Sequence, residues 1–145
     1  MLRALFVAVL FAVFGCAPQT RTRTSEPEPL YFSVQLTEGG KRIGAPKLIG
    51  FSGRRVIAER RQPGAAESDY RLVLEPEEKG GAYQLGVKLK LPSGDRSGEL
   101  GLQHGEERQL QLGKGAELKV MLMRVNSEEF RRLILEPGPV DRGQI

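Results

Sequence analysis

The chain of 145 residues has no tryptophan, one histidine and one cysteine, and only 6% of its residues are aromatic. A single cysteine excludes a disulfide within the chain, and one histidine with one cysteine excludes a four-ligand His/Cys zinc site. The 22 basic and 18 acidic residues leave a net charge of only +4. This charge is weak beside the concentrated basic stripe that nucleic-acid binding requires, so we expect no nucleic-acid partner.

Long hydrophobic runs are also scarce, and the clearest one covers residues 4–14 after a short, positively charged start. It fits the hydrophobic region of a secretory signal and is about half of the roughly 20 residues that a membrane-spanning helix needs. The run ends just before Cys16, so the sequence predicts a signal peptide over residues 1–15. Two alternatives are cleavage after Ala17 by an ordinary signal peptidase and an uncleaved apolar anchor.

The residues Val13, Phe14, Gly15 and Cys16 resemble the lipobox of bacterial lipoprotein precursors, in which an aliphatic, a tolerant and a small position precede an invariant cysteine. Phe14 is bulkier than is usual there. The resemblance implies cleavage before Cys16, a diacylglycerol on its thiol and an acyl chain such as palmitate on its amino group. Several acyl chains form a stable membrane anchor. Because Ala17 is not an aspartate, the sorting rule of Gram-negative lipoproteins implies the outer membrane, facing the periplasm.

The remaining chain divides into three parts. Residues 16–29 are rich in proline and in alternating Arg and Thr, which predicts a lipidated, disordered tether. Residues 137–145 are predicted to be a disordered tail. Residues 30–136 alternate apolar and polar side chains almost throughout. About eight short, mostly antiparallel strands predict an all-β fold, as a single small β-sandwich or barrel.

Several stretches indicate where the strands lie. The stripe of alternate apolar residues over 83–91 is the cleanest, and the stretch 118–125 is apolar on both faces, which is typical of a central strand. Pro46 interrupts residues 43–51 and places them at an edge or a bend. We assign residues 130–135 to a strand, with a short helix capped by Asn126 as the alternative.

The candidate binding residues are Arg54, Arg55, Arg60 and Arg61, which flank an apolar centre at residues 56–58. Charge on both faces is typical of an edge strand that resists pairing with other chains. The same edge can accept a strand from a partner while the arginines hold acidic groups. The partner expected here is an envelope protein or an anionic envelope polymer, in addition to the membrane that holds the lipid anchor.

One further resemblance is short. Residues 45–58 are similar to a stretch of the C-terminal module of secretins, the ring-forming outer-membrane pores. The matching positions are Pro46, Leu48, Ile49 and Gly53. The chain is too short for a whole secretin, and we carry no functional residue over.

Catalytic patterns are weak in this sequence. His104 lies at a predicted hairpin tip, where we expect a solvated side chain rather than a general base. Three pairs of adjacent glutamates lie in predicted turns, where carboxylates are usually solvated rather than opposed across a cleft: Glu77–Glu78, Glu106–Glu107 and Glu128–Glu129. Phosphate, dinucleotide and calcium loop motifs are missing from the sequence. We therefore expect no enzyme activity, no metal and no cofactor.

These features together favour a non-enzymatic, membrane-anchored envelope lipoprotein that binds or scaffolds another envelope component. The alternatives are a carrier of a small ligand or lipid, which needs an internal cavity, and an accessory subunit of an envelope secretion or assembly machine. An envelope hydrolase is a third possibility that the missing nucleophile motif disfavours.

Overall fold

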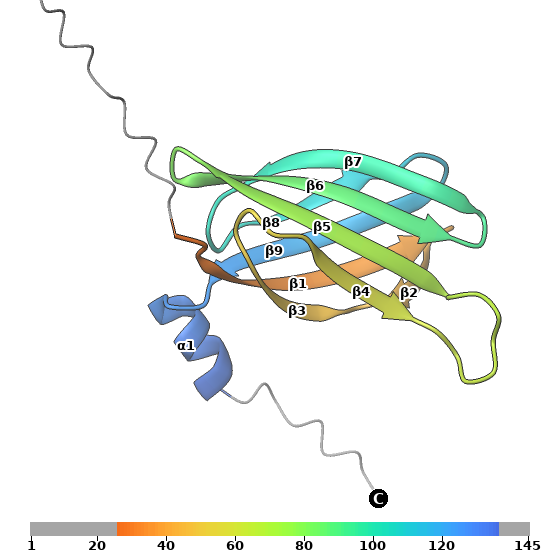
Figure 1. Cartoon of the computed structure of the whole chain (residues 1–145), viewed down its shortest axis with the longest axis horizontal. Coiled ribbons are helices and arrows are strands. Elements are labelled where there is room, and N and C mark those ends of the chain that lie inside the picture. The colour runs from red at the N-terminus through yellow and green to blue at the C-terminus, as the bar shows by residue number, and fades with distance from the viewer. Residues whose placement is uncertain (1–25, 137–145) are drawn as a thin grey trace, which may run out of the picture.

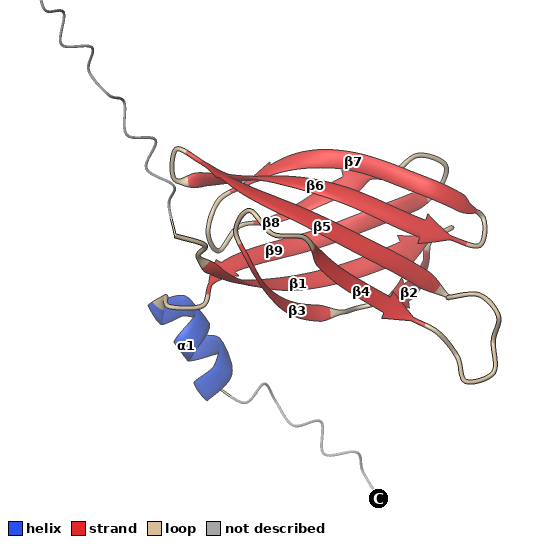
Figure 2. Ribbon diagram, viewed as in Figure 1, coloured by secondary structure: helices blue, strands red, loops and turns tan. Residues whose placement is uncertain are grey.

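The computed structural model describes residues 26–136, which form two antiparallel sheets that pack face to face, with one short helix at one end (Figures 1 and 2). The predicted signal peptide, Cys16 and the predicted tail lie outside the described residues. The strands of the first sheet are β1 (Pro29–Glu38), β2 (Lys41–Gly44), β3 (Lys47–Phe51), β8 (Glu107–Gln111) and β9 (Ala116–Arg124). Those of the second sheet are β4 (Val56–Arg60), β5 (Tyr70–Lys79), β6 (Ala82–Leu91) and β7 (Gly94–Leu102). This β-sandwich confirms the predicted fold class, and the sheets do not close into a barrel.

In the first sheet the order is β2-β1-β9-β8, and β3 also pairs with β1. The strands β2 and β3 share one edge of β1, because β2 pairs with its second half and β3 with residues 29–33. Pro46 lies between these two edge strands, and its carbonyl accepts the backbone N–H of Val34 at 3.0 Å. The predicted break at Pro46 is therefore confirmed.

The second sheet is a meander in the order β4-β5-β6-β7, which leaves β4 and β7 at its edges. The predicted edge strand around residues 56–58 is β4. The start of the folded part differs slightly from the predicted boundary at residue 30. Strand β1 begins at Pro29, and Glu28 is already bonded to Ser52. The folded part thus begins before residue 30.

The core lies between the two sheets and follows the predicted period of two. In β6, every second residue is buried, and none of the five is more than 5% exposed: Tyr83, Leu85, Val87, Leu89 and Leu91. In β9, Leu118, Val120 and Leu122 are fully buried, and Met121 on the opposite face is half-buried. Each fully buried leucine contributes about 2 kcal/mol of hydrophobic stabilisation, so these stripes hold the sheets together.

The segment after β9 forms the helix α1 (Glu128–Leu135), so the predicted strand over residues 130–135 is wrong. Ser127 caps the start of the helix, and its Oγ accepts the N–H of Phe130 at 3.2 Å. The alternative prediction of a helix was right in kind but placed the cap one residue too early, at Asn126. Two glutamates occupy the first turn, where the helix dipole favours negative charge. No helix of the described residues is long and apolar enough to cross a membrane.

Candidate functional site

The four predicted binding arginines lie at and beside β4, but most of their charge is already matched. Three of them pair with carboxylates, as Arg55–Glu75 at 3.2 Å, Arg60–Asp69 at 3.4 Å and Arg61–Glu59 at 3.1 Å. Arg54 instead lies over the ring of Phe51, with 5.6 Å from its guanidinium carbon to the ring centroid. An acidic partner would therefore have to compete with neighbouring carboxylates at three of the four positions.

The four arginines also do not form one patch. Arg54 and Arg55 precede β4, whereas Arg60 ends the strand and Arg61 follows it. At about 3.3 Å per residue, the five steps from Arg55 to Arg60 cover about 17 Å. Ile57 lies between the two pairs and is 47% exposed. The edge therefore presents two separate basic positions with an apolar side chain between them.

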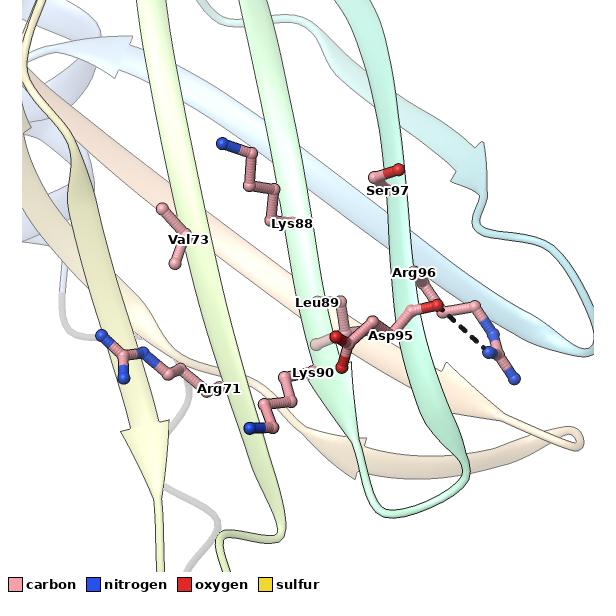
Figure 3. A pocket seen from close by; sticks show the side chains of 8 residues that line it. All are labelled: Arg71, Val73, Lys88, Leu89, Lys90, Asp95, Arg96 and Ser97. Atoms are coloured by element: carbon pink, nitrogen blue, oxygen red, sulfur yellow. Dashed lines mark hydrogen bonds between the residues drawn. The ribbon is translucent and has the colours of Figure 1, made fainter.

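The outer face of the second sheet carries further basic residues around a shallow hollow of about 310 Å³ (Figure 3). Strand register places Glu59, Arg71, Lys90 and Asp95 side by side in one row across the sheet. Figure 3 shows Lys90 between Arg71 and Asp95. Because cations occupy the middle of this row and carboxylates its ends, the face is mixed in sign rather than basic. The pKa of Glu59 is lowered, first by the Ser68 hydroxyl bonded to it and then by nearby arginines.

A cluster that the sequence did not predict lies where the chain enters the fold. It consists of Glu28, Ser52, Tyr83 and Arg124, and we call it the entry junction. The hydroxyl of Tyr83 donates to Glu28 Oε2 at 2.7 Å, and Arg124 Nε lies 2.9 Å from the Tyr83 hydroxyl and 3.2 Å from Glu28 Oε1. Glu28 N–H donates to Ser52 Oγ, and Ser52 N–H donates to the Glu28 carbonyl, both at 2.9 Å. Burial raises the pKa of the Tyr83 hydroxyl.

The entry junction joins three separate parts of the fold. Glu28 immediately precedes β1, Tyr83 is on β6 of the second sheet, and Arg124 ends β9. These interactions fix the first residues of the sandwich to both sheets at once.

His104 lies in the turn between β7 and β8, as predicted for a loop residue, but its side chain is bonded rather than free in solvent. Its Nδ1 accepts the backbone N–H of Arg124 at 3.0 Å, its Nε2 lies 3.2 Å from Glu129 Oε2, and its side chain is 22% exposed. Because Nδ1 accepts, the ring proton of the neutral form is on Nε2 and is donated to Glu129. The N–H of Glu129 itself and then the imidazole lower the pKa of that carboxyl. His104 thus connects β9 to the start of α1 and has no hydroxyl or thiol partner among the described residues.

The glutamate pairs were predicted to lie in turns, and this prediction is wrong for most of them. They lie mostly at the ends of strands and at the start of α1. Glu77 and Glu78 belong to β5, Glu107 begins β8, and Glu128 with Glu129 begins α1. These five side chains are exposed, as expected, and Glu106 is half-buried. Within residues 26–136, no group of three or more His, Cys, Asp or Glu side chains is placed to hold a metal ion.

An apolar groove lies between α1 and the first sheet. Phe130 of α1 packs on Tyr31 of β1, with ring centroids 5.2 Å apart. Beside this contact is an open hollow of about 460 Å³, lined by Tyr31, Lys47, Ile49, Phe130, Leu133, Ile134 and Glu136. The sequence prediction missed this surface because it placed a strand where α1 lies.

Compared with known proteins, the chain matches no family model, no curated protein and no solved structure. The candidate sites of this chain are therefore defined by the contacts described above. They comprise a paired basic edge, a row of mixed charges, the entry junction and an apolar groove.

Proposed function

We propose that the chain is a non-enzymatic lipoprotein of the bacterial cell envelope, in which Cys16 carries the lipid and the β-sandwich binds or scaffolds another envelope component. The observation that carries this proposal is the position of the chain's only cysteine. Cys16 directly follows an apolar run of secretory type and ends the lipobox-like sequence Val13-Phe14-Gly15-Cys16. Cleavage before Cys16 frees the amino group of this residue, which can then receive an acyl chain.

The architecture of the entry junction supports a tethered domain. The 12 steps from Cys16 to Glu28 span at most about 40 Å, which keeps the sandwich close to the bilayer. Glu28 is held by Ser52, Tyr83 and Arg124. Such fixation suits a domain that is attached to a membrane through its N-terminal side.

Two features bear on what the sandwich does there. The space between the sheets is filled by leucine, valine and aromatic side chains. This packing favours a domain that binds a partner at its surface over a carrier that holds a ligand in its interior. The edge strand β4, with Ile57 exposed on it and Arg54 exposed just before it, is the surface that we assign to an envelope protein or an anionic envelope polymer. By the sorting rule for Ala17, the location is the outer membrane on its periplasmic side.

The experiment that tests the anchor is the substitution Cys16→Ala, followed by metabolic labelling with a fatty-acid analogue and by membrane fractionation. The wild type is expected to incorporate the analogue and to sediment with membranes, and Cys16→Ala to incorporate none and to lose attachment or processing. Ala17→Ser is the matched control, because it changes the adjacent residue and retains the thiol. Equal labelling of the wild type and Cys16→Ala would refute the proposal.

The partner is tested in intact cells by crosslinking followed by mass spectrometry. A crosslinkable residue in place of Ile57 on β4 is expected to capture an envelope component. The same residue in place of Gln109, which is exposed on the opposite sheet, is the control for random encounters. Identical products from both positions would exclude β4 as the binding edge.

A further inference from the structure

Large exposed apolar side chains are concentrated at one end of the molecule. Five residues, which we call the apolar end, combine a strand and a helix that are far apart in sequence. Their exposed fractions are 64% for Ile49, 42% for Phe51, 44% for Leu133, 64% for Ile134 and 78% for Leu135. Exposed apolar side chains of this size, gathered in one place on a small domain, indicate a surface that is covered in use.

Two contacts bring these residues together. Ile49 pairs in register with Tyr31, and the ring of Tyr31 packs on Phe130 of α1. The groove beside this contact is lined by Ile49 from β3 and by Leu133 and Ile134 from α1. Phe51 follows Ile49 by two residues and therefore shares its face of the strand.

The apolar end is also where the chain enters the domain. Pro29, the first residue of β1, pairs in register with Phe51, and Glu28 is bonded to Ser52, the next residue after Phe51. Figure 1 shows α1 and the start of β1 at the same end of the sandwich, opposite the loop between β4 and β5. The segment that leads to Cys16 therefore leaves the domain directly beside the exposed apolar side chains.

The charges around the apolar end suit a surface of anionic headgroups. Arg54 lies over Phe51, and Arg131 and Arg132 are exposed on α1 between the buried Phe130 and the apolar last turn. The groove itself is lined by one basic and one acidic side chain, Lys47 and Glu136. The two acidic residues of the first turn of α1 already have partners, because Glu129 is bonded to His104 and Glu128 pairs with the exposed Arg132 at 3.8 Å.

From these relationships we propose that the apolar end docks onto the phospholipid bilayer, with Leu133, Ile134, Leu135, Ile49 and Phe51 at the level of the headgroups and upper acyl chains. This inference rests on the lipid anchor at Cys16. An eight-residue helix alone binds a bilayer weakly, but an anchor within about 40 Å raises its effective concentration at the surface. The arginines beside the apolar side chains then contact anionic headgroups, as in interfacial amphipathic helices. The domain is thereby held in one orientation, with the loop between β4 and β5 facing away from the membrane.

The test uses the full lipidated protein in vesicles of phosphatidylethanolamine with about a quarter phosphatidylglycerol, an anionic surface that attracts basic residues. An environment-sensitive fluorophore is attached at Ile134→Cys, and the control carries it at Ala65→Cys, in the loop at the opposite end. Lipidation blocks the thiol of Cys16, so each introduced cysteine is the only reactive thiol. Both positions are exposed, so the substitutions leave the core intact.

The expected result is a blue-shifted emission at position 134 and quenching by iodide that is several-fold weaker than at position 65. Adding Leu133→Asp and Leu135→Asp is expected to restore full quenching at position 134, while the protein still floats with the vesicles. Replacing phosphatidylglycerol by phosphatidylcholine is expected to weaken the protection at position 134. Flotation therefore reports on the anchor, and quenching reports on docking.

Equal quenching at positions 134 and 65 in protein that floats would overturn docking and leave the anchor intact. Failure to float would contradict the lipid anchor and docking together. Protection at position 134 that disappears when the protein is diluted within the vesicles, at constant lipid composition, would assign the apolar end to a second copy of the chain and overturn the bilayer as its occupant.

Discussion

The hydroxyl of Tyr83 donates a hydrogen bond to Glu28 Oε2 at 2.7 Å, and this bond connects β6 of the second sheet to the residue that precedes β1 of the first. The ring of Tyr83 belongs to the core, whereas its hydroxyl reaches the entry junction. One side chain thus contributes both to the packing between the sheets and to the fixation of the chain where it enters the sandwich.

Replacing Tyr83 by Phe retains the ring and removes the hydroxyl that lies between Glu28 and Arg124. We expect a loss of about 1.5–3 kcal/mol in the free energy of unfolding, as for hydrogen bonds to charged groups. Urea unfolding monitored by circular dichroism measures this loss. Tyr31→Phe is the control, since the hydroxyl of Tyr31 makes no hydrogen bond within the described residues. An equal loss in both variants would contradict the role of the entry junction.

The raised pKa of Tyr83 predicts a loss of stability in alkaline solution. Burial, the main cause of the rise, disfavours the phenolate in the folded protein, whereas the unfolded chain ionises at the ordinary pKa of about 10. The contribution of the protonated hydroxyl is therefore complete below pH 10 and is lost as the pH rises through the folded-state pKa. Unfolding midpoints measured across this range are expected to fall more steeply for the wild type than for Tyr83→Phe.

Gly50 lies where the edges of the two sheets approach each other. A methyl group at this position would overlap Cγ2 of Val56 on β4. We expect Gly50→Ala to lower the free energy of unfolding by about 1–3 kcal/mol, because an overpacked contact forces the strands apart. At Gly101 the nearest atom to an added methyl is 3.9 Å away, so Gly101→Ala is the matched control. Thermal unfolding of the two variants distinguishes a tight contact from a general cost of replacing a glycine in a strand.

The double substitution Arg55→Glu and Arg60→Glu tests whether β4 binds an acidic partner. It removes the ion pairs with Glu75 and Asp69, and we expect a loss of no more than about 1 kcal/mol per pair because the side chains are largely exposed. Under the binding hypothesis, capture of the native envelope partner is abolished, and the wild-type complex weakens with added salt. If the variant captures the same partners as the wild type, the arginines protect the edge and binding lies elsewhere.

The sequence predicted a small all-β sandwich or barrel because apolar and polar side chains alternate along a half-buried strand with a local period of two. The stripe that contains Leu85 could be recognised for this reason, and β9 could be recognised as a central strand because both of its faces are apolar. The helix α1 could not, because Leu133, Ile134 and Leu135 precede a proline just as residues 72–74 do in β5. The decisive contacts, the Ser127 cap and the packing of Phe130 on Tyr31, appear only in the folded chain.

The candidate site was less predictable than the fold. The edge position of β4 followed from its arginines, but their pairing with Glu75, Asp69 and Glu59 depends on strand register. The entry junction joins Glu28 and Tyr83, which are 55 residues apart, and no local pattern indicates such a contact. For the same reason, the sequence placed His104 in a loop but could not show its contact with the Arg124 backbone.

The central claim is that a lipid on Cys16 attaches this sandwich to a membrane. Mass spectrometry of the N-terminal peptide from the membrane-extracted protein tests it most directly. The account predicts a peptide that begins at Cys16, with a diacylglycerol on the thiol and an acyl chain on the amino group, each readable from the fragment masses. A peptide that begins at Met1 or at Pro18, or one that contains an unmodified Cys16, would contradict it.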